Sequence, residues 1–123
     1  MDGIKVLDTY VLWEIAMGNP KFIKYLDSNF LISDLILSEF YGIILREFNE
    51  QTANYWVLKF KCYSQQISLS ILLKAVKFRR EHAKKNLSFF DAAGYIFAKE
   101  NNYMFVTGDK EFETLPNVEF IKK

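Results

Sequence analysis

Four acidic residues stand where a helix is expected to begin or just inside one: Asp8, Glu39, Asp91 and Asp109. Asp8 follows the apolar run 4–7 and Asp109 follows the run 104–108, so both lie where a short buried strand ends. In an open parallel sheet, ligands bind beyond the carboxyl ends of the strands. Carboxylates gathered there, in a chain with one His and one Cys, are the ligand set of a hard divalent cation. The pattern predicts metal-dependent chemistry on phosphate.

Taken singly, each of these acids also has a structural explanation. Asp8 and Asp109 stand where an N-cap is expected, accepting the free N–H groups of the helix that follows. Ser88 and Asp91 have the spacing of a capping box, in which the acid reaches back to the serine. Glu39 also fits a solvated helix position. Because like charges repel strongly, a cluster of all four persists mainly when a cation neutralises it, so the joint pattern favours a site.

The elements that must position these acids are short apolar strands alternating with amphipathic helices. Strands are expected at 4–7, 30–32, 66–68, 103–107 and 118–121, the last at an edge. Helices are expected at 9–17, 20–28, 51–63, 69–85 and 88–100, with a long helix after the N-cap Ser33 and a helical turn at 110–114. This alternation predicts an α/β domain with a mostly parallel sheet.

Composition predicts one ordinary globular domain over residues 1–123. Half of the residues are apolar and a quarter are charged, without repeat, low-complexity tract or linker. Cys62 is the only cysteine, which excludes an internal disulfide and fits a reducing cytosol, and the lone His82 excludes a zinc site built mainly from His and Cys. The start of the chain has no leader-like pattern, and no apolar run reaches the ~20 residues of a membrane helix. We expect a cytoplasmic protein without membrane contact.

Four segments together resemble the signature segments of PIN domains: Val6–Thr9, Ser38–Glu39, Leu87–Ala93 and Val106–Phe112. Their order and spacing resemble most closely the small ribonuclease toxins of the VapC type, and the resemblance spans nearly the whole chain. It implies a three-layer α/β/α fold around a central, mostly parallel sheet. It also implies an endoribonuclease that depends on Mg²⁺ or Mn²⁺.

Carried over to this sequence, the resemblance implies that the metal-binding and catalytic positions are Asp8, Glu39, Asp91 and Asp109. Thr9 and Thr107 take the positions of supporting hydroxyls, held to the acids or to a bound water. Many members of the family carry a further acid after the last aspartate. Glu111 and Glu113 both stand there, and the sequence does not choose between them.

A basic stretch precedes the segment that carries Asp91. Six Lys and Arg residues lie between positions 74 and 85, against the single acid Glu81. Since the net charge of the chain is only +1, any contact with nucleic acid must come from such a local patch. One interpretation is that the stretch binds the RNA backbone, with Arg79 and Arg80 as the best candidates. The other is the solvated, cationic end of an amphipathic helix.

Aromatic residues are abundant, with twelve Phe, seven Tyr and two Trp. Most are expected in the core. A surplus along Tyr55, Trp56, Phe60 and Tyr63, or along Phe40, Tyr41 and Ile44, would instead form a dimer face or a groove for an amphipathic partner helix. The family resemblance implies both a homodimer and a cognate antitoxin.

Two other functions are alternatives to RNA cleavage. A phosphatase with an aspartyl nucleophile needs a second Asp two residues after Asp8, and Tyr10 stands there instead. A PIN-like module that processes or binds RNA without a toxin role, or that binds protein after losing catalysis, is the alternative within the same fold. The presence of all four acids favours the enzyme.

Overall fold

Five strands form the central sheet of this protein, and the computed structural model describes residues 3–123. The strands are β1 (Lys5–Leu7), β2 (Phe30–Ser33), β3 (Ser64–Gln65), β4 (Met104–Thr107) and β5 (Val118–Phe120), in the order β3-β2-β1-β4-β5. All neighbouring strands pair in parallel, so their carboxyl ends lie at one edge of the sheet. The sequence predicts no leader peptide at the start of the chain. The first two residues of that segment, Met1 and Asp2, lie outside the described residues.

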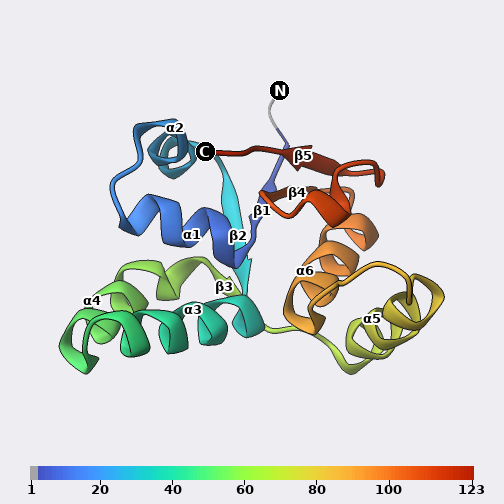
Figure 1. The fold of residues 1–123 in the computed structure, drawn as a ribbon, viewed down its shortest axis with the longest axis horizontal. Coiled ribbons are helices and arrows are strands. Elements are labelled where there is room, and N and C mark those ends of the chain that lie inside the picture. Colours follow the sequence, from blue (N-terminus) through green and yellow to red (C-terminus); the bar gives the residue numbers. More distant parts are fainter. Residues whose placement is uncertain (1–2) are drawn as a thin grey trace.

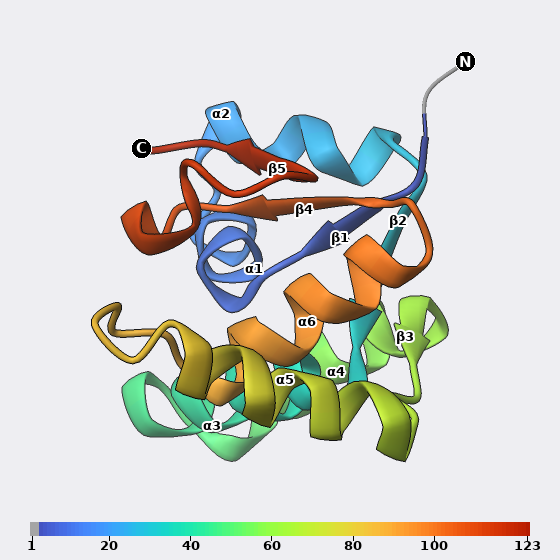
Figure 2. The same cartoon turned by 90° about the vertical axis from the view of Figure 1, so that its right-hand side faces the viewer.

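Helices cover both faces of this sheet. They are α1 (Thr9–Ala16), α2 (Pro20–Ile23), α3 (Asp34–Glu47), α4 (Glu50–Phe60), α5 (Leu69–Glu81) and α6 (Phe89–Glu100), with 3-10 turns η1 (Lys24–Asp27), η2 (Lys61–Tyr63) and η3 (Lys110–Phe112). Figure 1 shows α1 and α2 on one side of the strands and α6 and α5 on the other, with α3 and α4 below. Figure 2 shows α5 lying along α6, farther from the strands.

Polar caps set the starts of the helices that carry the acids. Ser33 and Ser88 cap α3 and α6, and each serine oxygen accepts a hydrogen bond of 3.0 Å from the backbone N–H three residues on. Asn49 and Ser68 begin α4 and α5 in the same way. Each cap satisfies an N–H group that the first helical turn leaves free, so the sequence fixes where these helices begin.

Four expected elements differ clearly in extent or position. The segment 51–63 is α4 followed by η2 rather than one helix. The segment 20–28 is a short α2 followed by η1 rather than one helix. The helix expected to reach residue 85 ends at Glu81, where the His82 N–H bonds to the Phe78 carbonyl and the chain turns. The strand expected at 66–68 is wrong, because it is Ser64–Gln65 that pairs with β2. That pairing is set across the sheet, which local residue patterns do not reveal.

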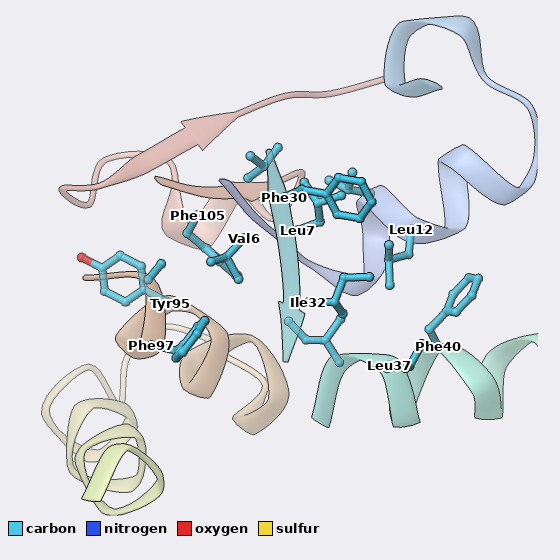
Figure 3. Close-up of a cluster of buried hydrophobic side chains, with 14 of the residues drawn as sticks. Val6, Leu7, Leu12, Phe30, Ile32, Leu37, Phe40, Tyr95, Phe97 and Phe105 are labelled. Carbon is cyan, nitrogen blue, oxygen red and sulfur yellow. The ribbon is translucent and has the colours of Figure 1, made fainter. Parts of the chain in front are cut away.

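The core fills the space between the sheet and the helices, as Figure 3 shows. Val6, Leu7, Ile32 and Phe105 point from three adjacent strands into it and are completely buried. Gly94 lets α6 approach closely, since a Cβ there would lie 2.8 Å from the Ile36 Cδ1 atom and 3.0 Å from Phe105 Cε1. This packing fixes the start of α6 relative to the edge of the sheet.

The core also takes part of the aromatic surplus. Phe40, Ile44 and Phe60 are at most 1% exposed, and the rings of Phe40 and Phe60 meet edge to face at 5.9 Å. The core interpretation therefore holds for these three residues, because α3 and α4 pack against each other. Tyr55 and Tyr63 stay exposed. Within residues 3–123, none of the helices is long and apolar enough to cross a membrane.

Candidate active site

The four acids come from four elements that meet at the carboxyl edge of the sheet. Asp8 follows β1 and caps α1, while Asp109 follows β4 and caps η3. Glu39 lies in the second turn of α3, and Asp91 lies in the first turn of α6. Because α3 contacts both α1 and α6, the structure brings all four side chains to one region.

Asp8 is the most deeply buried of these acids, at 1% exposure. Its Oδ1 accepts a hydrogen bond of 2.9 Å from the Val11 N–H, which makes it the N-cap of α1. Its Oδ2 accepts a hydrogen bond of 2.5 Å from the Thr107 hydroxyl. Both carboxylate oxygens are therefore held in place, one by the helix and one by the neighbouring strand.

Two threonine hydroxyls link the acids to the scaffold. The buried Thr107 hydroxyl donates to Asp8 and accepts a hydrogen bond of 3.0 Å from the Asp109 N–H, so it connects the two strand-end aspartates. Asp109 in turn accepts from the Glu111 N–H at 2.9 Å. The Thr9 hydroxyl donates to the Glu39 carboxylate across the contact between α1 and α3.

Asp91 differs from the other three acids. Its backbone N–H donates to Ser88, which is one half of the capping box, but its carboxylate does not complete the other half. Instead, its Oδ1 is buried and has no hydrogen-bond partner among residues 3–123. A buried, unpartnered carboxylate oxygen is costly, so it calls for a group that the chain itself does not supply.

The electrostatics confirm that the acids act on one another. Burial, and secondarily the charge of Asp109, raises the pKa of Asp8 from 3.8 to about 7, although hydrogen bonds from Thr107 and Val11 oppose the rise. Burial and then the charges of Asp8, Glu39 and Asp109 raise the pKa of Asp91 from 3.8 to about 8. Burial and mutual repulsion thus disfavour the ionised forms of Asp8 and Asp91, and a cation beside them would favour those forms.

This donor set fits a hard divalent cation. The ligand atoms are carboxylate oxygens, one of them is buried and free, and their mutual repulsion would be relieved by positive charge. No group of three or more acidic, His or Cys side chains within residues 3–123 is arranged to hold an ion directly. Mg²⁺ suits this spacing because it keeps several waters and uses only one or two carboxylates from the protein.

Gly108 joins the two strand-end segments closely. A Cβ at this position would lie 2.2 Å from the Cε1 atom of Tyr10, so the Tyr10 ring rests directly against the backbone between Thr107 and Asp109. The ring also packs edge to face on Phe22, with 5.6 Å between the centroids. Tyr10 occupies the position at which an aspartyl phosphatase would need a second Asp. In this structure its ring packs against the loop that carries Asp109.

The two candidate acids after Asp109 lie in different environments. Glu111 is half-buried and its N–H is bonded to Asp109, whereas Glu113 is exposed. A further buried acid, Glu14 on α1, accepts from Asn19 at 3.0 Å and lies 3.8 Å from the Lys123 ammonium group. Glu14 thus has structural partners of its own.

The basic stretch surrounds a hollow of about 480 Å³ lined by Arg79, Arg80, Lys85 and the loop before α6. The Arg79 Nε donates to the Leu87 carbonyl at 2.9 Å, and the Lys85 Nζ donates to the Glu111 carbonyl at 2.8 Å. Both contacts hold the loop that leads to Ser88 and Asp91. The Arg80 guanidinium is exposed and makes no ion pair within the described chain.

A cleft of about 480 Å³ opens beside the acids and was not predicted from the sequence. Glu39 and Asp91 form part of its wall, and Tyr10, Trp13 and Arg46 form another part. The only local signal for it is the spacing of Tyr10 and Trp13, which are three residues apart on the helix after Asp8. Their meeting with α3 depends on the tertiary fold.

No model of a protein family matches the chain, and no curated protein matches it. Solved structures do. A toxin–antitoxin complex from Klebsiella pneumoniae is similar at 21% identity and a TM-score of 0.77, covering 97% of this chain and 99% of that one. VapBC2 from Rickettsia felis, bound to a DNA fragment from its promoter, is similar at 18% identity and a TM-score of 0.77, covering 98% of both chains.

A third structure extends the comparison. The Mycobacterium tuberculosis VapC toxin described as cleaving the sarcin-ricin loop is similar at 16% identity and a TM-score of 0.74, covering 97% of this chain and 98% of that one. At such low identity these likenesses establish the fold. The expected three-layer α/β/α, PIN-like fold is confirmed, and it is the fold of the VapC toxins.

Proposed function

We propose that this protein is a PIN-domain endoribonuclease that depends on Mg²⁺ or Mn²⁺ and is the toxin of a toxin–antitoxin pair. The observation that carries the proposal is the buried, unpartnered Oδ1 of Asp91 among three further carboxylates at the carboxyl edge of a parallel sheet. The likeness of the fold to a toxin described as cleaving an RNA loop supports RNA as the substrate.

In this proposal Asp8, Glu39, Asp91 and Asp109 surround the cation, one or two of them directly and the others through its bound waters. When bound, the cation supplies Lewis-acid activation of water and offsets the charge of the phosphodiester. The chain's own contribution is to fix the acids. Thr107 and the Val11 N–H orient Asp8, the Thr9 hydroxyl orients Glu39, and the Ser88 cap sets the start of the helix that carries Asp91.

Asp91 has a distinct position in the proposal. Its Oδ1 accepts no hydrogen bond within residues 3–123, whereas one oxygen of each of the other three acids accepts a hydrogen bond from the chain. This buried oxygen is therefore the one whose missing partner the cation would supply. The scheme uses no covalent nucleophile.

The test is RNA cleavage by purified Asp91→Asn protein. We expect cleavage with Mg²⁺ or Mn²⁺ to fall by about a hundredfold or more, because the uncharged amide binds the cation poorly. EDTA is expected to stop the wild-type protein, and added Mn²⁺ to restore it. The control is Asp27→Asn, which neutralises an exposed acid on η1.

Thermal unfolding of both variants separates lost chemistry from lost structure. Wild-type cleavage rates in a folded Asp91→Asn protein would reject the assignment of the site. Undiminished cleavage in EDTA would reject the metal dependence.

An antitoxin and a homodimer complete the proposal. Several similar structures are complexes of a toxin with an antitoxin, which supports such a partner here. A groove of about 720 Å³ between α3 and α4, lined by Leu37, Tyr41, Val57 and Leu58 among others, suits the apolar face of a partner helix. We assign the homodimer to α5, where Leu69, Leu73 and Val76 form one exposed apolar stripe.

The toxin role and the RNA-processing alternative differ in the effect of the protein on cell growth and in whether an inhibitor exists. A toxin should arrest growth on expression, and the product of a neighbouring gene should relieve the arrest and block cleavage in vitro. Cleavage without growth arrest and without such an inhibitor would favour RNA processing.

A further inference from the structure

The cleft beside the acids is lined by residues of two chemical kinds. Glu39 and Asp91 are among them, so the cleft adjoins the candidate active site. Tyr10, Trp13, Ile43 and Arg46 also line it and supply aromatic, apolar and guanidinium groups. A ligand bound in this cleft would therefore lie next to the phosphodiester on which the acids are proposed to act.

Local helix geometry and one long-range contact build the aromatic wall. Tyr10 and Trp13 are three residues apart on α1, and Ile43 and Arg46 are three residues apart on α3, so each pair shares a helix face. Because α1 packs against α3, the two faces border one space. The Trp13 ring lies 6.2 Å, centroid to centroid, from the ring of Phe48, the residue that follows the last turn of α3, and the indole is half-buried.

These side chains have the chemistry that holds an unstacked base. Aromatic rings and planar guanidinium groups stack on nucleobases, and single-stranded RNA is recognised largely in this way. The Arg46 side chain is 70% exposed and is anchored by Glu47, with 3.0 Å between Nε and Oε2, so its planar group stands at the rim. A space of about 480 Å³ lies within the usual size of small-ligand sites.

The apolar part of the lining favours a base over a backbone phosphate in this cleft. Glu39 and Asp91 belong to the acids beside the proposed cation, and Glu47 is paired with Arg46. Trp13 and Ile43 offer apolar surface, which suits an uncharged nucleobase better than a charged phosphate. The N–H groups of a nucleobase can also donate to the carboxylates of the lining.

We propose that this cleft, named here the Trp13 cleft, is a nucleobase subsite that holds the base flanking the scissile phosphate of single-stranded RNA. The base stacks on Trp13, and Arg46 covers it from the rim. This inference rests on the proposed ribonuclease function and adds a substrate contact outside the four acids.

Binding of short oligonucleotides tests the subsite without any cleavage. The reference protein is Asp8→Asn/Trp56→Phe, which is not expected to cut RNA and which retains Trp13 as its only tryptophan. The probes are homotetramers of A, C and U and an abasic ribose-phosphate tetramer of equal charge. We expect the base-containing tetramers to quench Trp13 fluorescence and to bind about tenfold or more tightly than the abasic one.

Substitutions then locate the effect. Adding Trp13→Leu should weaken binding of the base-containing tetramers by roughly ten- to a hundredfold and leave abasic binding unchanged, whereas Trp13→Phe should retain most of the affinity. Tyr55→Leu, which removes an exposed aromatic ring from α4, is the control and should bind like the reference protein. Anisotropy of labelled tetramers measures these affinities, and thermal unfolding verifies each variant.

Equal affinity for base-containing and abasic tetramers would overturn the proposal, as would a Trp13→Phe protein that has lost all preference for bases. If Trp13→Leu weakens only the binding of an inhibitor protein, the cleft belongs to that protein and the proposal also fails. The outcome is separate from catalysis. A wild-type protein that binds bases through Trp13 but cuts no RNA would reject the ribonuclease while keeping the subsite.

Discussion

Asp8 and Asp91 are both buried acids with raised pKa values, but their carboxylates differ in structural role. Asp8 is a helix cap and a member of the acid cluster at once, so its structural and functional explanations are compatible. Asp91 contributes its backbone to a cap while its carboxylate does no capping. The unmatched oxygen of Asp91 is therefore the clearest sign of a site at the scale of single residues.

The raised pKa values of Asp8 and Asp91 predict a pH-dependent stability for the metal-free protein. In the folded state the two pKa values are about 7 and about 8, whereas both are near 3.8 in the unfolded chain. The folded state thus binds more protons between about pH 4 and pH 8, and its stability falls as pH rises through that window. We expect a loss on the order of a few kcal/mol between pH 5 and pH 8, measured by urea unfolding in EDTA.

Two controls accompany this measurement. Asp8→Asn should flatten the decline, because the amide does not ionise. Mg²⁺ should restore stability to the wild-type protein at pH 8 more than at pH 5. An identical decline in wild type and Asp8→Asn would show that this carboxyl does not cause the effect.

Gly108 leads to a prediction about the loop that carries Asp109. In Gly108→Ala the new methyl group would meet the Tyr10 ring at 2.2 Å, so the ring or the loop must move. We expect a destabilisation of about 1–3 kcal/mol together with reduced cleavage. Tyr10→Ala in the same chain should relieve the clash, so a double-mutant cycle from urea unfolding should give an interaction energy well away from zero. Additive effects would mean that Tyr10 does not limit this position.

At the scale of elements, the loop between α5 and α6 sets the position of Asp91. The Arg79 side chain holds this loop at Leu87, and Lys85 ties it to the segment after Asp109. Part of the basic stretch is therefore structural. Arg80, by contrast, is exposed and makes no ion pair within residues 3–123.

This difference separates the expected effects of two substitutions. Arg80→Ala should weaken RNA binding, because one phosphate of the single strand is no longer neutralised by the protein. Fewer counterions are then released on binding, so the slope of log affinity against log salt concentration should decrease in magnitude by about 0.7. Arg79→Ala should also lower thermal stability, because the loop loses its anchor. Lys99→Ala, at the far end of α6, is the control for the loss of one positive charge. A salt slope unchanged by Arg80→Ala would return this residue to the solvated face of its helix.

At the scale of the whole molecule, two of the apolar surfaces within residues 3–123 are large enough to suggest partners. One is the groove between α3 and α4, and the other is the exposed stripe of Leu69, Leu73 and Val76 along α5. A groove accepts an inserted helix, whereas a stripe of this kind can pair with its own copy about a two-fold axis. The two surfaces can therefore serve two different partners at the same time.

Leu73→Glu tests the assignment of the α5 stripe. Light scattering should return about 29 kDa for the wild-type protein, twice the 14.5 kDa of one chain, and about 14.5 kDa for the variant, because a charge is buried unpaired in the interface. Leu58→Glu, in the groove between α3 and α4, should stay dimeric and lose affinity for the inhibitor. A monomeric wild-type protein at tens of micromolar, or a dimeric Leu73→Glu, would reject this assignment.

The sequence by itself determined the features that depend on neighbouring residues. Apolar periodicity indicated the strands and helices, and the serines at 33 and 88 marked where two helices begin. The placement of Asp8 and Asp109 at strand ends, combined with the rule for parallel sheets, predicted that acids gather at one edge. These inferences succeed because helix and strand periods, and the caps that end them, are local properties of the chain.

The tertiary structure decided everything that depends on residues distant in the sequence. It showed that the Asp91 carboxylate leaves the capping box unfinished, that Phe40 and Phe60 belong to the core, and that Arg79 anchors a loop. It also created the Trp13 cleft, which exists only because α1 packs on α3 about thirty residues later in the chain. Burial and unpaired polar atoms arise from such long-range packing, and no local pattern encodes them.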